Sequence, residues 1–341
     1  MSDQTSCEHD ERSTGFERST EDIKHDQSSK QTDHCLTKYC HNMFKILKGS
    51  ITMTGGIAFT AMALAVQVIP STQRIRASHT QIANLTILGL TFYTSMFHLL
   101  LLIKFKTTAG KRLAKKFQLK KYEVYDICVK SVSALQAFLA CLFACLVVME
   151  DRCNMKNNFI AYSRWIDFYT WFGLPYFFYD IVVMYKAYTM EHGYMDVQTF
   201  ILRNKIIFLH HLFIPTVGLL GVMTLRRKFG DCVFMFLYTM EFSTIFVNIR
   251  LILHRLRMTS SVLYFANGIA MLVSFFICRI VLLPYMFYAY IKLFDLSVLD
   301  AIKNIPLVCH FTIALFMILQ VYWLGLMLRV TARLLRQHLT R

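Results

Sequence analysis

Apolar residues gather in eight stretches along the chain, and most of the segments between these stretches are short and polar. A transmembrane helix needs about 20 consecutive, mostly apolar residues, and each stretch has roughly this length. The pattern therefore predicts an all-α polytopic membrane protein. The eight stretches are 51–70, 82–103, 127–149, 166–188, 205–225, 232–254, 263–290 and 305–328.

The first stretch, 51–70, differs from the others in its content of small and polar residues. It contains Thr52, Thr54, Gly55 and Gly56, and it ends at Pro70. Such a segment can cross the bilayer, or it can lie in the interface or re-enter the membrane. The sequence leaves these alternatives open.

The composition agrees with a membrane protein and excludes an ordinary soluble enzyme. Hydrophobic residues make up 55% of the 341 positions and charged residues 17%, whereas soluble domains have roughly 45–50% and about 25%. Residues 1–50 are polar, hold nine of the 21 acidic residues and have no secretory signal, so we expect a disordered tail. The expected organisation is this tail, a membrane segment and loop over 51–81, a transmembrane domain over 82–330 and a basic cytosolic tail over 331–341.

The net charge of +16 is better explained by membrane topology than by nucleic-acid binding. The loop 104–126 holds eight Lys and Arg residues, and cytosolic loops carry the excess of these residues in membrane proteins. If this loop is cytosolic, then 186–205, 250–257 and the C-terminus share its side, which holds 18 basic residues against eight opposite. We therefore expect a multi-pass protein of the lipid bilayer with a cytosolic C-terminus and no nucleic-acid partner.

Several polar residues fall within the predicted spans. A charged side chain there costs about 2.5–3.5 kcal/mol on insertion scales and usually marks function. With a rise of about 1.5 Å per residue, Asp180, His210, His211 and Asn248 share one depth, roughly 8–12 Å inside the cytosolic end. Glu241 and Arg279 share a deeper level, roughly 20–24 Å inside. The other polar positions within the spans are Lys130, Arg250 and Gln320.

His210 and His211 are the most distinctive of these residues. Adjacent helical residues lie about 100° apart, so the two rings cannot share a face. We expect one ring to face a cavity and the other to support it. Pro215 lacks an N–H and its ring clashes with the carbonyl of His211, which predicts a kink. A neutral His can act as base, acid or acyl-accepting nucleophile, and the alternative is two structural histidines bonded between helices.

Glu241, Thr244 and Asn248 form a polar stripe at spacings of three and four residues on one helix face. Such a stripe is expected to face the interior of the bundle. There Glu241 is a candidate to orient an imidazole or to take up a proton. A structural ion pair between Glu241 and Arg279 is the alternative.

Asp180 and Lys130 are further candidates near the cytosolic ends of their helices. Asp180 follows Tyr179, and the pair fits either a substrate site or an aromatic belt at the membrane interface. Lys130 either extends to the surface or binds an anionic headgroup or a CoA phosphate.

The ten cysteines show no spacing typical of a zinc site, and no metal is expected. Cys153 and Cys232 both fall on the predicted non-cytosolic side, where they could pair. The alternative is that the cysteines act as small hydrophobic residues and free thiols.

Four blocks of sequence resemble the TLC-domain family, which takes its name from TRAM, Lag1 and CLN8 and includes the ceramide synthases. The blocks are WFGLPYFFYD (171–180), FLHH (208–211), MEFSTIFVNIR (240–250) and NGIAMLVSFFICRIVLLPY (267–285). The last block is similar to the TLC domain-containing protein 3 group. The similarity covers roughly residues 85–330.

This resemblance implies six core transmembrane helices around a lipid-binding cavity, here with one or two additional N-terminal helices, in the endoplasmic reticulum. In ceramide synthases, to which the resemblance is more distant, fatty acyl-CoA acylates the amine of a sphingoid base and the histidine pair is catalytic. His210 and His211 inherit that role as candidates. The complete candidate site adds the acids Glu241 and Asp180 and the substrate- or lipid-binding residues Tyr179, Thr244, Asn248, Arg279 and Lys130.

Two functions remain open at this point. The first is a ceramide-synthase-like N-acyltransferase of sphingolipid metabolism, with acyl-CoA as co-substrate, a sphingoid base as acceptor and no resident cofactor. The second is a non-catalytic lipid-binding regulator of membrane lipid composition. Ceramide synthases carry two Asp residues after the histidine pair, whereas Glu241 is the one acid matched to that region here, so the second hypothesis stays open. Association into a homodimer or a heterodimer is also left open.

Overall fold

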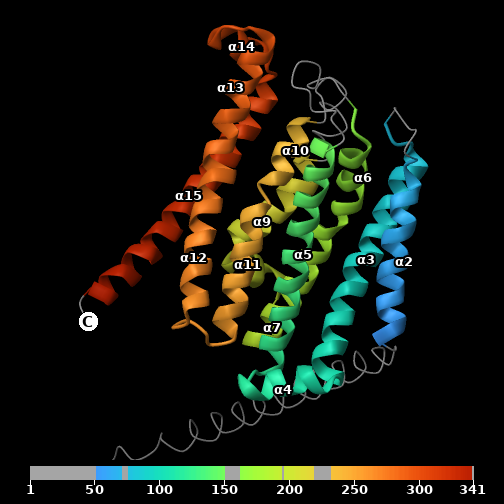
Figure 1. The fold of residues 1–341 in the computed structure, drawn as a ribbon, viewed down its shortest axis with the longest axis vertical. Helices are drawn as coiled ribbons and strands as arrows, with labels where there is room; N and C mark the ends of the chain where they lie inside the picture. Colours follow the sequence, from blue (N-terminus) through green and yellow to red (C-terminus); the bar gives the residue numbers. More distant parts are fainter. Residues whose placement is uncertain (1–50, 71–75, 150–161, 194–195, 219–231, 340–341) are drawn as a thin grey trace, which may run out of the picture. The chain divides into compact units, whose positions relative to one another are not determined.

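The computed structural model describes residues 51–70, 76–149, 162–193, 196–218 and 232–339, and every element in these ranges is helical (Figure 1). The prediction of an all-α polytopic membrane protein is therefore confirmed. The predicted tail over 1–50 lies outside the described residues. The elements are α2 (Ile51–Val68), α3 (His79–Lys106), α4 (Thr108–Lys116), α5 (Lys121–Met149), α6 (Arg164–Gly173), α7 (Pro175–His192), α8 (Val197–Arg203), α9 (Lys205–Phe213), the π-helical turn η1 (Ile214–Gly218), α10 (Cys232–Thr239), α11 (Phe242–Arg255), α12 (Val262–Phe275), the π-helical turn η3 (Phe276–Val281), α13 (Leu282–Phe294), α14 (Val298–Asn304) and α15 (Leu307–Leu339).

Within the described ranges, six helices are long and apolar enough to cross a membrane, so the chain is an integral multi-pass membrane protein. The first of them is α2, which has 18 residues and the hydropathy of a span. At the other end of the chain, α15 continues through most of the predicted basic tail, as far as Leu339. The six candidates are Ile51–Val68, His79–Lys106, Lys121–Met149, Phe234–Arg255, Val262–Phe294 and Cys309–Arg333.

Two predicted stretches do not form continuous spanning helices. Residues 166–188 fall on α6 and α7, which meet at Leu174, because Pro175 has no N–H to continue the hydrogen-bond ladder of α6. Residues 205–225 begin as α9 and pass into η1 at Pro215. The apolar helix described there, Lys205–Val217, is shorter than a span, and 219–225 lie outside the described residues.

The largest hydrophobic core lies between α2, α3, α5, α6 and α7, and aromatic rings fill much of it. Tyr93 of α3 contacts the rings of Phe172 and Tyr176, which flank the joint between α6 and α7. The second large set of contacts joins α5 to α10 and α11, and α11 to α12. Since α5 contacts α3, α6, α7, α10 and α11, it forms the centre of the bundle that positions the polar residues.

Two arginines join the ends of α5, α7 and α11 at one end of the bundle. Arg255 of α11 donates hydrogen bonds to Asp126 of α5 and to both carboxylate oxygens of Glu191 of α7, each at 2.8 Å. Arg257 donates to both oxygens of Glu123 at 3.0 and 3.2 Å. The segments around 104–126, 186–205 and 250–257, which the charge pattern assigns to one side, therefore lie at one end of the helices.

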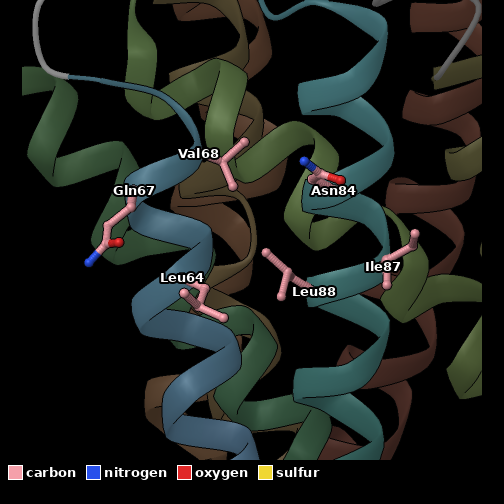
Figure 2. A pocket seen from close by; sticks show the side chains of 6 residues that line it. All are labelled: Leu64, Gln67, Val68, Asn84, Ile87 and Leu88. Carbon is pink, nitrogen blue, oxygen red and sulfur yellow. The ribbon is translucent and has the colours of Figure 1, made fainter.

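A groove runs between α2 and α3 near the other end of these helices (Figure 2). Its volume is about 420 Å³, and apolar side chains form most of its wall with one amide on each helix. None of the predicted site residues lines this groove. The lining residues are Leu64, Gln67, Val68, Asn84, Ile87 and Leu88.

Candidate functional site

His211 of α9 and Asp180 of α7 lie side by side. The His211 Nδ1 atom is 3.3 Å from the Asp180 Oδ2 atom, and the side chains are 16% and 6% exposed. The edge of the Phe177 ring, one turn before Asp180, packs against the His211 ring. The contact has the distance of an ion pair without the alignment of a hydrogen bond. The equal depth predicted for these two residues is thus realised as a direct contact.

His210 faces different neighbours. Its ring packs perpendicular to the ring of Trp323 of α15, with the centroids 5.0 Å apart. The centroids of the two histidine rings are 5.7 Å apart and their planes differ by 78°. The two imidazoles are thus directed to two helices, His211 to α7 and His210 to α15, as their spacing around the helix requires.

The backbone changes form directly after the histidines. Helix α9 ends at Phe213, and Pro215 lies in the π-helical turn η1, where the sequence predicts a kink. The Thr216 hydroxyl donates to the Leu212 carbonyl at 2.6 Å, which satisfies a backbone acceptor next to that of His211. Turns of this kind are rare and occur often at functional sites.

Arg279 forms a second polar cluster, at the centre of α11, η3 and α15. Its guanidinium donates to Ser243 Oγ at 2.8 Å, to Thr244 Oγ1 at 2.6 Å and to Gln320 Oε1 at 3.3 Å. The residue is only 5% exposed. Three helical elements therefore meet on one buried cation.

Glu241 belongs to this cluster. Its Oε1 atom is 3.7 Å from the Arg279 Nη2 atom, and the Glu241 side chain is 20% exposed. It stands at the turn between α10 and α11, where it precedes the first residue of α11. Glu241 therefore forms the ion pair with Arg279 that the sequence offered as an alternative. The acid beside His211 is Asp180.

Asn248, the third member of the predicted polar stripe, joins α11 to α5. Its side-chain amide donates to Ser133 Oγ and to the Thr244 carbonyl, both at 2.9 Å. Asn248 is buried, and both of these bonds go to residues other than the histidines and Asp180. Although Asn248 shares the predicted depth of His211, its side chain faces α5.

Tyr179 and Lys130 occupy the other predicted positions. Tyr179 is buried against the rings of Phe97 and Tyr176, and its hydroxyl has no hydrogen-bond partner within the described ranges. Lys130 is half-buried on α5. Neither side chain touches the His211–Asp180 pair through an ion pair or hydrogen bond between described residues.

Three residues that contact these clusters, Ser243, Ser133 and Trp323, are uncharged, so the pattern of charged residues in the spans does not reveal them. Ser243 and Ser133 are small and neutral, and nothing in their type distinguishes them from other helix serines. Trp323 has a weak signal, because it follows Gln320 by three residues and so shares its helix face. Cys153 lies outside the described residues and the side chain of Cys232 is not described, so their pairing stays a prediction.

The match to a family model covers more than half of the chain. The model is that of the TLC domain, TRAM_LAG1_CLN8, and it matches residues 126–329. This range includes both polar clusters, from Asp180 and the histidines to Arg279 and Trp323. The α2 and α3 helices lie before it. The chain belongs to the TLC-domain family, a family of lipid-related membrane proteins.

Proposed function

We propose that this protein transfers a fatty acyl group from acyl-CoA to the amine of a sphingoid base, with His211 as the base and Asp180 as its partner. The observation that carries the proposal is the 3.3 Å contact between the imidazole of His211 and the carboxylate of Asp180. A carboxylate next to one ring nitrogen favours a proton on that nitrogen. The other nitrogen, Nε2, is then free to accept a proton.

The reaction balances without a resident cofactor. As the amine nitrogen attacks the thioester carbonyl carbon, it loses a proton to Nε2 of His211. The tetrahedral intermediate then collapses, the carbon–sulfur bond breaks, and the proton passes from the imidazolium to the CoA thiolate. The products are an N-acyl amide and free CoA. A positioned base of this kind contributes roughly 10²–10⁴-fold to a rate.

Asp180 suits its role because it is nearly buried and has one oxygen close to the imidazole. It stabilises the imidazolium that forms during proton transfer, as the buried Asp does in a Ser-His-Asp triad. Contacts of this kind are often loose without substrate and tighten in the complex. The 3.3 Å separation is compatible with that behaviour.

His210 and Glu241 have supporting places in this proposal. The His210 ring, held against Trp323, fixes the rotation of α9 and so presents His211 to α7. Glu241 balances the charge of Arg279 and keeps α11 joined to η3. We further propose that the protein resides in the endoplasmic reticulum, where acyl-CoA reaches it from the cytosol.

The test is turnover by purified protein in detergent, given isotope-labelled acyl-CoA and sphinganine. Mass spectrometry of the lipid product and a thiol assay for released CoA should rise together. His211→Ala should abolish both, and Asp180→Asn should lower them by roughly 10²-fold or more. His254→Ala is the matched control, because His254 is an exposed histidine at the end of α11, and it should keep full activity.

Two outcomes would overturn the proposal. If His211→Ala made as much product as the unaltered protein, the base would lie elsewhere. If the unaltered protein made no amide while lipid co-purified equally with it and with His211→Ala, the second function would stand. That function is a lipid-binding regulator of membrane composition.

A further inference from the structure

The α4 helix joins two candidate spans, α3 and α5, through a sharp turn at Thr107. The Thr107 hydroxyl donates to the Ile103 carbonyl at 2.6 Å and accepts from the Gly110 N–H at 3.0 Å. Gly110 lies directly against the end of α3, since a Cβ atom there would be 2.5 Å from the carbonyl oxygens of Ile103 and Lys104. The first turn of α4 is therefore fixed across the end of α3 (Figure 1).

The other end of α4 is held by Arg257. Its guanidinium donates to the carbonyl of Phe117, the residue that follows α4, at 2.9 Å. It also binds Glu123 of α5. With both ends held, α4 is fixed at the end of the bundle, between the last residue of α3 and the first residue of α5.

The side of α4 that faces away from the bundle is strongly cationic. Four basic residues in two adjacent pairs, one helical turn apart, are exposed, while Leu113 and Ala114 between the pairs are half-buried. None of the four pairs with an acid among the described residues, and the sequence has no Asp or Glu from 104 to 122. The exposed basic residues are Lys111, Arg112, Lys115 and Lys116.

We propose that α4 is an interfacial helix whose basic face binds the headgroups of anionic phospholipids. Helices with a basic face and an apolar face lie in the membrane interface, and clusters of Lys and Arg next to a span bind anionic lipid. The charges of α4 are spread along its outer side, which suits a layer of headgroups. This inference does not rest on the acyltransferase proposal.

The experiment measures lipid binding to purified full-length protein in detergent by native mass spectrometry. The probes are dioctanoyl phosphatidylserine and dioctanoyl phosphatidylcholine, with free CoA as a competitor. The variant is Lys111→Gln/Lys115→Gln, and the control is Lys292→Gln/Lys303→Gln, which removes two exposed lysines at the other end of the bundle. Gel filtration and melting temperature show that each variant is folded.

We expect the unaltered protein and the control to bind phosphatidylserine in preference to phosphatidylcholine, with an affinity that falls as salt is added. The α4 variant should lose this preference, by roughly fivefold for each lysine removed. Equal phosphatidylserine binding by the variant would overturn the proposal. It would also be overturned if CoA displaced the lipid and bound more tightly to the unaltered protein than to the variant, because α4 would then be a nucleotide site.

Discussion

Two acids of the predicted site have different partners, and the partner decides what each can do. Asp180 lies 3.3 Å from the imidazole of His211, and Glu241 lies 3.7 Å from the guanidinium of Arg279. A carboxylate beside an imidazole orients it and stabilises its protonated form. A carboxylate beside a buried guanidinium neutralises a permanent positive charge. One acid is therefore suited to chemistry and the other to structure.

The Arg279 cluster leads to a prediction about stability. Arg279→Met should lower the free energy of unfolding by about 3–5 kcal/mol, because Glu241 loses its counter-charge and three oxygens lose their donor. The measurement is the melting temperature of the purified protein in detergent. The melting temperature of Arg279→Lys should lie between those of the unaltered protein and Arg279→Met, because a lysine keeps the charge but not the planar set of donors.

A double variant separates the charge effect from lost packing. Arg279→Met/Glu241→Gln removes both charges and should recover part of the stability lost in Arg279→Met alone. If Arg279→Met melted at the same temperature as the unaltered protein, the cluster would have no structural role.

Depth along a helix shows which residues are at the same level and can come into contact. It does not show which of them are in contact. The sequence places Asp180, His211 and Asn248 at one level, and Asp180 and His211 are indeed in contact. Asn248, at the same level, is turned to Ser133 of α5. The reason is that depth follows from a constant rise per residue, whereas the direction of a side chain depends on how the helices pack.

At the scale of the elements, three of the predicted site residues fall beside breaks in helix regularity. Glu241 stands at the turn between α10 and α11, Arg279 lies in η3, and His211 comes three residues before η1. A regular helix satisfies its own backbone and offers only side chains, whereas a wide turn frees backbone groups and redirects side chains. These breaks allow helices from different parts of the chain to converge on one residue.

The joint between α6 and α7 leads to a prediction for Gly89 of α3. A Cβ atom at Gly89 would lie 2.1 Å from the carbonyl oxygen and 2.9 Å from the carbonyl carbon of Phe172. Gly89→Ala should therefore separate α3 from α6 and lower the free energy of unfolding by about 1–3 kcal/mol. Thermal unfolding in detergent measures this.

Gly56→Ala on α2 is the matched control, because a Cβ atom at Gly56 would have nothing within 4 Å. This change should be neutral or stabilising, since Ala favours a helix over Gly by roughly 0.5–1 kcal/mol. Equal melting temperatures for the two variants would contradict the close approach of α3 and α6.

Prolines mark three of these breaks in the sequence, and one break has no such signal. Pro215 predicts the change at η1, and Pro175 marks the joint at Leu174, which hydropathy alone does not reveal. Pro284 lacks the N–H that would bond the carbonyl of Ile280 in η3, so it marks this break in the same way. The turn at Met240 and Glu241 contains no proline or glycine. That turn lies where Glu241 pairs with Arg279, and local sequence does not encode this contact.

At the scale of the whole molecule, charge marks one end of the helices. Arg255 donates two hydrogen bonds to Glu191 and thereby holds the pKa of the Glu191 carboxyl below its ordinary value of 4.5. A lowered pKa in the folded state stabilises the fold above the ordinary value, and this stabilisation is lost as the pH falls through the folded value.

This pKa shift predicts a pH-dependent difference between the unaltered protein and Glu191→Gln. Near neutral pH the variant should be less stable by up to about 1 kcal/mol, since the pair is partly exposed to solvent. The difference should shrink as the pH drops below 4.5 and vanish once Glu191 is protonated. Melting temperatures of both proteins across this range check it, and a difference that stays constant would contradict the role of the pair.

The excess of basic residues at the α4 end predicts that this end faces the cytosol. Lys115→Cys on α4 and Leu299→Cys on α14 place thiols at opposite ends of the helices (Figure 1). In sealed microsomes, a membrane-impermeant maleimide should label Lys115→Cys at once and Leu299→Cys only after permeabilisation. The unaltered chain gives the background from native cysteines, and the reverse labelling pattern would invert the topology.

By itself the sequence determined the helical class, five of the six candidate spans and the gathering of basic residues at one end. These properties follow from hydropathy and from the constant rise of a helix, which act locally along the chain. Only the tertiary structure decided that His211 pairs with Asp180, that Glu241 pairs with Arg279 and that His210 rests on Trp323. These contacts depend on how each helix is rotated against its neighbours, and that rotation is set by packing among all the helices.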